Sequence, residues 1–278
     1  MTDRYGVMGN PVGHSKSPFI HARFAEQTDQ DLEYHAIPVE RDHFAAAVER
    51  FRCAGGKGLN VTLPFKEEAW SLADIRTPRA ELAGAVNTLW FGAAGVRHGD
   101  NTDGAGLVRD LERNHGARLR GRRLLLVGAG GAARGVLGPL LGEGPELLVV
   151  ANRTVERAQR LAAVFAAAGP VRAGAFEALA GERFDVVINA TSASLEGRVP
   201  AIPDDLLAPG GWCYDMMYAD APTAFVRWGE AHGAGKSVDG LGMLVEQAAE
   251  SFYVWRGVRP ETGPLIAELR AAGCRPGT

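Results

Sequence analysis

The sequence predicts an α/β protein with two α/β domains. Short apolar runs typical of buried strands alternate with helical segments through most of the 278 residues. A glycine-rich turn at residues 128–133 joins one of these runs to a helix. A chain of this length forms one large domain or two ordinary ones. We expect one domain to comprise residues 103–238 and the other, discontinuous in sequence, to comprise residues 1–102 and 239–278.

The first hundred residues predict a mainly parallel sheet with helices between its strands. Apolar residues of strand type recur in three short segments. Two further segments, 85–91 and 96–99, flank Gly92-Ala-Ala-Gly95, which is typical of a hairpin. The three expected strands before the hairpin are residues 4–8, 32–39 and 58–61.

A helix start is encoded at Ser17-Pro18. Serine can cap the free amides of a helix, and proline fits the first helical position. We therefore expect a helix over residues 18–27, with Ser15 and Ser17 at its positive end. That end favours a carboxylate or another anion.

The second domain begins with the pattern of a nucleotide-binding unit: strand, glycine turn, helix, strand. Its later strands are expected to end at the ligand crevice, at the carboxyl edge of a parallel sheet. Two helices, over residues 241–255 and 260–271, are expected to pack back on the first domain. The expected strands of the second domain are residues 124–127, 147–151, 184–189 and 212–215.

The turn Gly128-Ala-Gly-Gly-Ala-Ala133 fits the dinucleotide fingerprint of a Rossmann-like domain. Its small residues permit a tight turn and close approach of a pyrophosphate to the helix start. Glycine turns between a strand and a helix are common, so the surrounding βαβ pattern carries much of this interpretation. The expected pyrophosphate-binding residues are Gly128, Ala129, Gly130, Gly131 and Ala132.

The end of the next strand indicates which cofactor is bound. An NAD site normally has an acidic residue there, whereas this chain has Asn152-Arg153-Thr154, with Arg157 one turn further on. These residues predict a receptor for the 2'-phosphate of NADP. The alternative is that both arginines are ordinary solvated residues at the start of a helix.

Lys66 and Asp103 are the candidates for proton transfer. Lys66 follows Pro64 at a helix start, where its positive charge opposes the helix dipole, so helix stability does not explain it. Asp103 closes Asp100-Asn-Thr-Asp103 before the next helix. Each has an alternative role, Lys66 as a surface charge and Asp103 as a helix cap. Paired, they can give and take a hydroxyl proton during hydride transfer.

Composition excludes several classes of function. The net charge of −3 provides no basic surface for nucleic acid or anionic lipid, so we expect a small-molecule substrate. No segment has the pattern of a signal peptide or a membrane span, and an odd number of cysteines argues against a disulfide framework, so we expect a cytoplasmic protein. Neither the cysteines nor the histidines have metal-ligand spacing, and we expect no metal. These residues are Cys53, Cys213, Cys274, His14, His21, His35 and His43.

Several longer motifs follow one another in a fixed order. They are Gly9-Asn-Pro-Val-Gly-His-Ser15-Lys-Ser17-Pro, Asn60-Val-Thr62-Leu-Pro-Phe-Lys66, Ala85-Val-Asn87-Thr, Gly99-Asp-Asn-Thr-Asp103-Gly, the glycine turn, Asn152-Arg-Thr and Asp239-Gly-Leu-Gly-Met-Leu-Val-Glu-Gln247-Ala. Over nearly the whole chain this set resembles the bacterial shikimate dehydrogenase family. The resemblance implies reversible, NADPH-dependent reduction of 3-dehydroshikimate to shikimate, in aromatic amino-acid biosynthesis. We expect a monomer or a homodimer.

The resemblance also implies a role for each matching residue. Ser15 and Ser17 match hydroxyls that bind the substrate carboxylate, and Lys66 with Asp103 matches the catalytic pair. Residues matching contacts to the ring hydroxyls or the carboxylate are Asn60, Thr62, Asn87, Tyr218 and Gln247. Beyond the glycine turn and the 152–157 segment, the residues matching cofactor contacts are Thr191, Met216 and Gly240, the last two along the nicotinamide.

Some alternatives stay open at this point. Either Lys66 or Asp103 is the formal base of the pair. A quinate/shikimate dehydrogenase that uses NAD is disfavoured by Arg153, and a non-catalytic NADP-responsive regulator on the same fold is disfavoured by the intact pair. The chain departs from the family pattern at Ala133, where many members have serine, and at Ser192-Ala-Ser-Leu, where the loop is usually richer in glycine.

Overall fold

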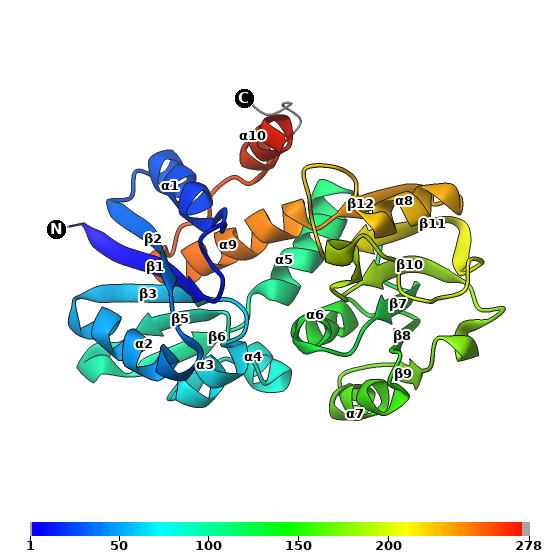
Figure 1. The fold of residues 1–278 in the computed structure, drawn as a ribbon, viewed down its shortest axis with the longest axis horizontal. Helices are drawn as coiled ribbons and strands as arrows, with labels where there is room; N and C mark the ends of the chain where they lie inside the picture. Colours follow the sequence, from blue (N-terminus) through cyan, green and yellow to red (C-terminus); the bar gives the residue numbers. More distant parts are fainter. Residues whose placement is uncertain (1, 274–278) are drawn as a thin grey trace. The chain divides into compact units, whose positions relative to one another are not determined.

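The structure, a computed structural model, describes residues 2–273 and contains two compact α/β units (Figure 1). Unit 1 comprises residues 2–106 and 245–265, and unit 2 comprises residues 107–244 and 266–273. The predicted fold class is confirmed. Cys274, one of the three cysteines considered above, lies outside the described residues.

Unit 1 is built on a sheet with strand order β2-β1-β3-β5-β6-β4. Strand β1 pairs in parallel with β2 and β3, and β4 in parallel with β6, whereas β5 is antiparallel to β3 and β6. Strands β5 and β6 confirm the expected hairpin. The strands are β1 (Asp3–Gly9), β2 (Leu32–Pro38), β3 (Gly56–Val61), β4 (Ile75–Arg76), β5 (Thr88–Phe91) and β6 (Arg97–Asp100).

The two faces of this sheet are covered differently. One face forms an apolar cluster that includes Met8, Leu59 and Phe44 of α2. The other face carries Tyr5, Val7 and Tyr34 and packs against Trp255 of α9. Because side chains alternate along a strand, Asn60 lies on the α9 face of β3, between two residues of the apolar cluster. The helices are α1 (Ser17–Thr28), α2 (Phe44–Cys53), α3 (Lys66–Leu72), α4 (Pro78–Ala83) and α9 (Leu241–Arg256).

The start of α1 differs by one residue from the expectation. Ser17 is the first helical residue, and Lys16 precedes it as the cap residue without a side-chain cap hydrogen bond. The expected cap by Ser17 is therefore wrong. Instead, Ser15 Oγ accepts a hydrogen bond from the Ser17 backbone N–H at 3.2 Å, so a serine still satisfies one free amide of the first turn.

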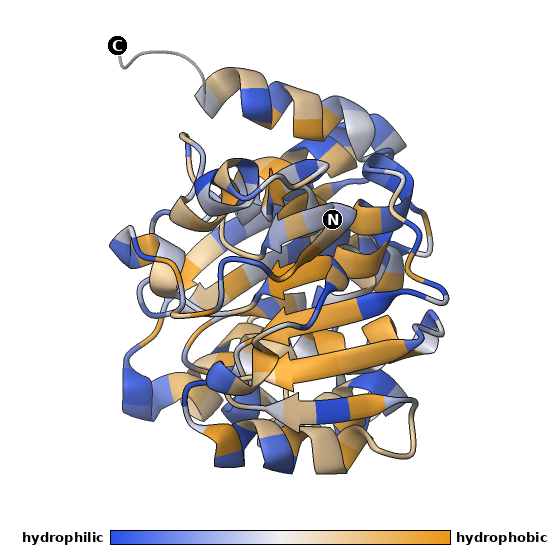
Figure 2. Ribbon diagram, turned by 90° about the vertical axis from the view of Figure 1, so that its right-hand side faces the viewer, coloured by the Kyte–Doolittle hydropathy of each residue, from blue (hydrophilic) through white to orange (hydrophobic). Residues whose placement is uncertain are grey.

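Unit 2 contains a fully parallel sheet with strand order β12-β11-β10-β7-β8-β9. The two outermost strands were not expected from the sequence, because they are short and carry polar residues. Strands β7, β8 and β10 are mostly apolar, and Figure 2 shows hydrophobic strands, in orange, inside the fold. The strands are β7 (Arg123–Val127), β8 (Leu147–Ala151), β9 (Val171–Gly174), β10 (Phe184–Asn189), β11 (Leu207–Asp215) and β12 (Lys236–Asp239).

Helices α6 and α10 lie where they were expected to within a few residues, whereas no helix was predicted at the position of α8. Alternate residues of the inner strands pack against Phe225 and Trp228 of α8. No helix within residues 2–273 is long and apolar enough to cross a bilayer. The helices are α5 (Asp103–Arg109), α6 (Gly131–Gly142), α7 (Val155–Phe165), α8 (Ala224–Ala231) and α10 (Gly263–Gly273), of which α5 and α10 include residues of both units, as does α9.

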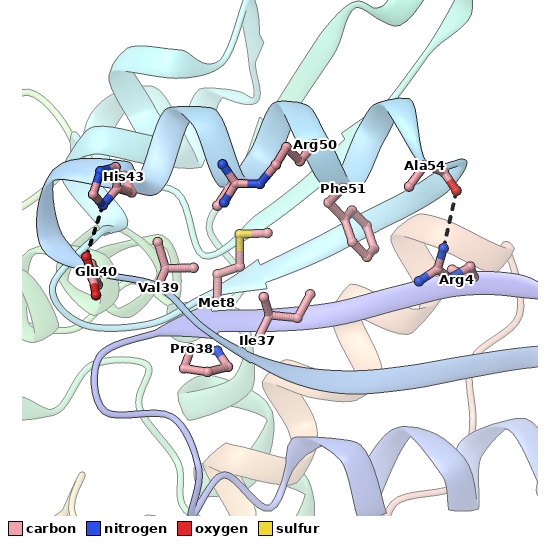
Figure 3. A pocket seen from close by; sticks show the side chains of 11 residues that line it. Arg4, Met8, Ile37, Pro38, Val39, Glu40, His43, Arg50, Phe51 and Ala54 are labelled. Atoms are coloured by element: carbon pink, nitrogen blue, oxygen red, sulfur yellow. Dashed lines mark hydrogen bonds and ion pairs between the residues drawn. The ribbon is translucent and has the colours of Figure 1, made fainter.

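A hollow of about 600 Å³ lies between α2 and the β1–β2 edge of unit 1 (Figure 3). Met8, Ile37 and Phe51 point into it, and Arg4 donates a hydrogen bond to the Ala54 carbonyl at one end. None of the site residues expected from the sequence lines this hollow.

Candidate active site and cofactor site

Lys66 and Asp103 form an ion pair in unit 1. Each is the first residue of its helix, α3 or α5. The Lys66 Nζ atom donates to Asp103 Oδ2 at 2.6 Å, and the two side chains are 23% and 11% exposed. The pair is therefore mostly shielded from water but still accessible, as a group that exchanges a proton with a bound substrate must be.

The second oxygen of Asp103 is also bound within unit 1. Asn87 Nδ2 donates to Asp103 Oδ1 at 2.7 Å. At the start of α5 it is Asn101 Oδ1, not the Asp103 carboxylate, that accepts the Asp103 backbone N–H, at 3.2 Å. The carboxylate thus binds Lys66 and Asn87, which leaves the helix-cap role to Asn101.

Asn87 connects this pair to Gln247 of α9. Its Oδ1 accepts the Thr102 backbone N–H at 2.9 Å, and its Nδ2 lies 3.3 Å from Gln247 Oε1. Because the amide is held from both ends, its orientation toward Asp103 is fixed. Val86 N donates to the Lys66 carbonyl at 2.9 Å, so the same segment also holds the start of α3.

Asn60 is the second amide of the site. Its Oδ1 accepts the Tyr34 hydroxyl at 2.8 Å, and its Nδ2 donates to the Asn87 carbonyl at 3.1 Å and to Ser251 Oγ at 2.9 Å. These contacts occupy both amide hydrogens but only one of the two lone-pair directions on Oδ1. What Asn60 retains for a ligand is an acceptor, which suits a hydroxyl group.

Tyr34 links the start of α1 to this amide. Burial raises the pKa of its phenol well above the usual value, with the Ser17 side chain acting in the opposite direction. His21 stacks on the Tyr34 ring with centroids 4.2 Å apart, and burial lowers the pKa of His21 to about 3, so the imidazole is neutral. The Tyr34 hydroxyl thus lies between Ser17 and Asn60.

Several of these supporting residues were not predicted from the sequence. Ser251 could have been predicted, because it lies one helical turn after Gln247 in the sequence. In the structure it is fully buried on α9. Thr88, whose hydroxyl donates to Asn87 Oδ1 at 2.9 Å, and Thr102 are each adjacent to a residue that was predicted. Tyr34 could not have been predicted, since a tyrosine in a half-buried strand is ordinary.

The other residues expected to bind the substrate are Ser15, Thr62 and Tyr218. Ser15 and Thr62 are half-buried in unit 1, and the Thr62 backbone N–H donates to the Met8 carbonyl at 2.9 Å. Tyr218 belongs to unit 2, where burial, Asp220 and Asp239 raise the pKa of its phenol.

The glycine turn lies in unit 2 between β7 and α6. Gly128 has φ +114°, a conformation that side chains disfavour, and its N–H donates to the Ala151 carbonyl at 2.7 Å. A Cβ on Gly130 or Gly131 would meet nothing within 4 Å. Packing within the protein therefore does not require these two glycines, whereas close approach of a ligand to the start of α6 does.

The segment after β8 carries unpaired positive charge. Arg153 and Arg157 are exposed, and in the described chain no hydrogen bond or ion pair joins either side chain to another residue. Asn152 Nδ2 donates to the Thr154 carbonyl at 2.9 Å, which shapes the turn before α7. The open turn and the two free guanidinium groups fit a dinucleotide with a 2'-phosphate.

The remaining residues expected to contact the cofactor also lie in unit 2. Thr191 follows β10, Met216 follows β11 and Gly240 follows β12, so each is at the carboxyl edge of the parallel sheet. Thr191 is half-buried and Met216 is buried. Within residues 2–273, no group of three or more His, Cys, Asp or Glu residues is arranged to hold a metal ion.

Three family models match the chain. They are described as the shikimate dehydrogenase substrate binding domain, over residues 7–89, shikimate / quinate 5-dehydrogenase, over residues 110–196, and the shikimate 5'-dehydrogenase C-terminal domain, over residues 240–270. Together they cover more than half of the sequence.

Similar proteins carry the same description. The chain is 63% identical over 270 residues to "Shikimate dehydrogenase (NADP(+))" of Alkalilimnicola ehrlichii, covering 97% of this chain and 99% of that one. It is 58% identical over 270 residues to the protein of the same name from Halorhodospira halophila, with the same coverage.

Solved structures agree with this relationship. An Ael1 enzyme from Pseudomonas putida matches with a TM-score of 0.91 and 48% identity, over 96% of this chain and 98% of that one. Shikimate 5-dehydrogenase from Thermus thermophilus in complex with NADP(H) and shikimate matches with a TM-score of 0.86 and 33% identity, over 98% and 100% of the two chains. The chain therefore belongs to the shikimate dehydrogenase family.

Proposed function

We propose that this protein is an NADP-dependent shikimate dehydrogenase, which reduces 3-dehydroshikimate to shikimate reversibly in aromatic amino-acid biosynthesis. The observation that carries the proposal is the Lys66–Asp103 ion pair, hydrogen-bonded to Asn87, in a chain that belongs to this family. Hydride transfer to a carbonyl needs a group that supplies a proton as negative charge develops on oxygen.

Lys66 is the group that exchanges this proton, and Asp103 orients it. The ammonium group has three hydrogens, of which Asp103 binds one. In the reductive direction a remaining hydrogen is available to the substrate oxygen. Both oxygens of Asp103 already accept a hydrogen bond within the protein, which suits a positioning role.

The substrate binds through groups that match its chemistry. Asn60 and Gln247 face ring hydroxyls, and Ser15 and Ser17 bind the carboxylate at the start of α1, where free amides favour an anion. A small anionic polyol needs many such partners, because each buried polar group left unpaired costs about 1 to 3 kcal/mol. Thr62, Asn87 and Tyr218 complete the proposed set.

The cofactor is NADP, held by the residues of unit 2. The glycine turn and the free amides of α6 receive the pyrophosphate, and Arg153, with Arg157, receives the 2'-phosphate. Bound nicotinamide supplies or accepts the hydride. Thr191, Met216 and Gly240 are proposed to surround it.

The two alternatives are less well supported. The relatives named above are NADP enzymes, which does not favour an NAD-dependent quinate/shikimate dehydrogenase. A non-catalytic regulator has no need of an intact Lys66–Asp103 pair.

We further propose that residues 1–102 and 239–278 form the substrate domain and residues 103–238 the NADP domain. The compact units, with boundaries near residues 106 and 245, support this division in outline, but residues 266–273 group with unit 2 rather than with the proposed substrate domain. The net charge and the family support a cytoplasmic protein that acts as a monomer or homodimer without nucleic acid.

The test is a spectrophotometric assay of purified protein with shikimate or quinate, each combined with NADP or NAD. We expect reduced-cofactor absorbance to rise fastest with shikimate and NADP. A faster reaction with quinate and NAD would establish the alternative enzyme, and no reaction in any combination would support the regulator.

A further inference from the structure

Asp215, the last residue of β11, is a fully buried carboxylate with four hydrogen-bond donors. Its Oδ2 accepts hydrogen bonds from Ser194 Oγ at 2.5 Å and from Thr223 Oγ1 at 2.6 Å. Its Oδ1 accepts Asn189 Nδ2 at 2.9 Å and the Met217 backbone N–H at 3.1 Å. Within the described residues no ion pair joins it to a cation, and burial raises its pKa.

These donors come from two different loops of unit 2. Ser194 belongs to the segment that follows β10, and Met217 and Thr223 to the segment that follows β11. The first loop has a second connection through Asn189, whose Oδ1 accepts both the backbone N–H of Thr191, at 3.0 Å, and its hydroxyl, at 2.7 Å. One carboxylate therefore ties together both loops at this edge of the sheet.

The backbone at Met216 is fixed from the other side as well. Its N–H donates to the Asn189 carbonyl at 2.9 Å, and the Gly240 N–H donates to the Met217 carbonyl at 3.0 Å. A Cβ on Gly240 would lie 2.4 Å from the Met216 carbonyl oxygen, so only glycine permits this contact. The position of Met216 thus depends on Asp215, Asn189 and Gly240 together.

Burying a carboxylate without a cation costs free energy, so the connection between the two loops is not made for stability alone. What the carboxylate supplies is four acceptor directions in the space of one small side chain. Thr191 and Met216, the residues held in this way, are proposed cofactor contacts, and neither is part of the glycine turn or of the arginine segment that receives the phosphates.

We propose that Asp215 is a positioning residue for the nicotinamide half of NADP, acting through Thr191 and Met216. The proposal rests on the cofactor assignment made above. It separates the cofactor site into two parts: the adenosine and phosphate half, held by the turn and the arginines, and the nicotinamide half, held by the two loops that Asp215 connects.

The test compares the dissociation constants of NADPH and of adenosine 2',5'-bisphosphate, which lacks the nicotinamide half, measured by titration calorimetry. Asp215→Ala should weaken NADPH binding by about tenfold or more and change bisphosphate binding by less than about twofold. Asp215→Asn should recover most of the NADPH affinity, because its oxygen can still accept two hydrogen bonds and its amide can donate to two hydroxyls. Ser194→Ala removes one of the donors to Asp215 and should weaken NADPH binding roughly fivefold. If Asp215→Ala does not fold, this variant tests the proposal.

The matched control is Asp185→Ala, at the amino end of the neighbouring strand β10. Asp185 accepts the Arg123 backbone N–H at 2.8 Å and Arg122 Nη1 at 3.1 Å, so its loss also removes carboxylate hydrogen bonds. Both affinities should stay near those of the wild type. The proposal would be overturned if Ser194→Ala and Asp215→Ala kept the wild-type affinity for NADPH, or if they lost equal affinity for both ligands. A wild type that binds neither ligand would overturn the cofactor assignment together with it.

Discussion

Lys66 and Asp103 hold opposite charges at adjacent helix starts, and Asn87 holds the carboxylate from its other oxygen. In the proposed mechanism this arrangement gives each residue a separate part in proton transfer. Lys66 keeps free donor hydrogens, whereas Asp103 is bound on both sides. The consequence is that changing Asp103 affects the orientation of Lys66 as well as the charge of the site.

We expect Asp103→Ala to lower turnover by about 10²-fold or more, because Lys66 loses its orienting partner. Asn101→Ala is the matched control, since Asn101 accepts the first amide of the same helix. It should cost about 1 kcal/mol of stability with a much smaller loss of turnover. Steady-state kinetics and thermal unfolding of both variants test this. An Asp103 variant altered only in stability would show that Asp103 supports the fold rather than proton transfer.

Arg153 is expected to set the preference for NADP over NAD. A charge-assisted contact to the 2'-phosphate contributes about 1.5 to 3 kcal/mol, so Arg153→Ala should lower the ratio of the two kcat/KM values roughly ten- to a hundredfold. Arg157 can share the phosphate, so Arg153→Asp, which adds repulsion, is needed to invert the preference. The ratio is measured with shikimate saturating. If Arg153→Asp leaves it unchanged, Arg153 does not bind the phosphate.

Helix α1 contributes a packing surface and, in the proposed substrate site, the anion-binding end. Ser15 and Ser17 lie at its start, and its buried face packs through His21 against Tyr34, whose hydroxyl reaches Asn60. The start and the side of one helix thus affect different parts of the substrate site, and two separate substitutions distinguish them.

Replacing Ser15 and Ser17 together with alanine should raise the KM for shikimate at least about tenfold while kcat changes less. The reason is that both hydroxyls are proposed to bind the carboxylate, which takes no part in the chemistry. A substrate analogue without the carboxylate provides the control, because its binding should be insensitive to the substitutions. An equal loss for that analogue would show that the serines act on something else.

His21 predicts how stability depends on pH. Its pKa is about 3 in the folded protein, against an ordinary value of 6.5. Between these values the unfolded chain binds more protons, so the free energy of unfolding falls as pH decreases, by up to about 1.4 kcal/mol per pH unit from this group. The wild type should therefore lose stability relative to His21→Phe when both are unfolded in urea at pH 7, 6 and 5. A difference between the two proteins that is independent of pH would contradict the buried, neutral state of His21.

At the scale of the whole molecule, periodicity and turn residues predicted the elements that are long or strongly apolar. Strands β7, β8 and β10 and helices α1 and α9 lie where they were expected, within a few residues. The edge strands β9 and β12 were missed, since pairing at an edge depends on the neighbouring strand rather than on local apolar residues. Strand β11 begins five residues before the expected start, in a Pro-Gly-Gly stretch that resembles a loop.

The residues of the candidate site were only partly predictable from the sequence. The need for proton transfer indicated Lys66 and Asp103, and the family resemblance indicated Asn87. The supporting hydrogen bonds of Tyr34, Ser251 and Asp215 join residues distant in sequence or on different loops, and no local pattern encodes such contacts. Residues that position others are therefore found only when the fold is known.

The central claim is that Lys66 transfers the proton, and Lys66→Ala tests it most directly. Turnover with shikimate and NADP should fall about 10²- to 10⁴-fold, while the dissociation constant of shikimate, measured by calorimetry, changes much less, because most binding contacts remain. A variant with wild-type turnover, or one whose loss of activity is explained entirely by weaker shikimate binding, would contradict the claim.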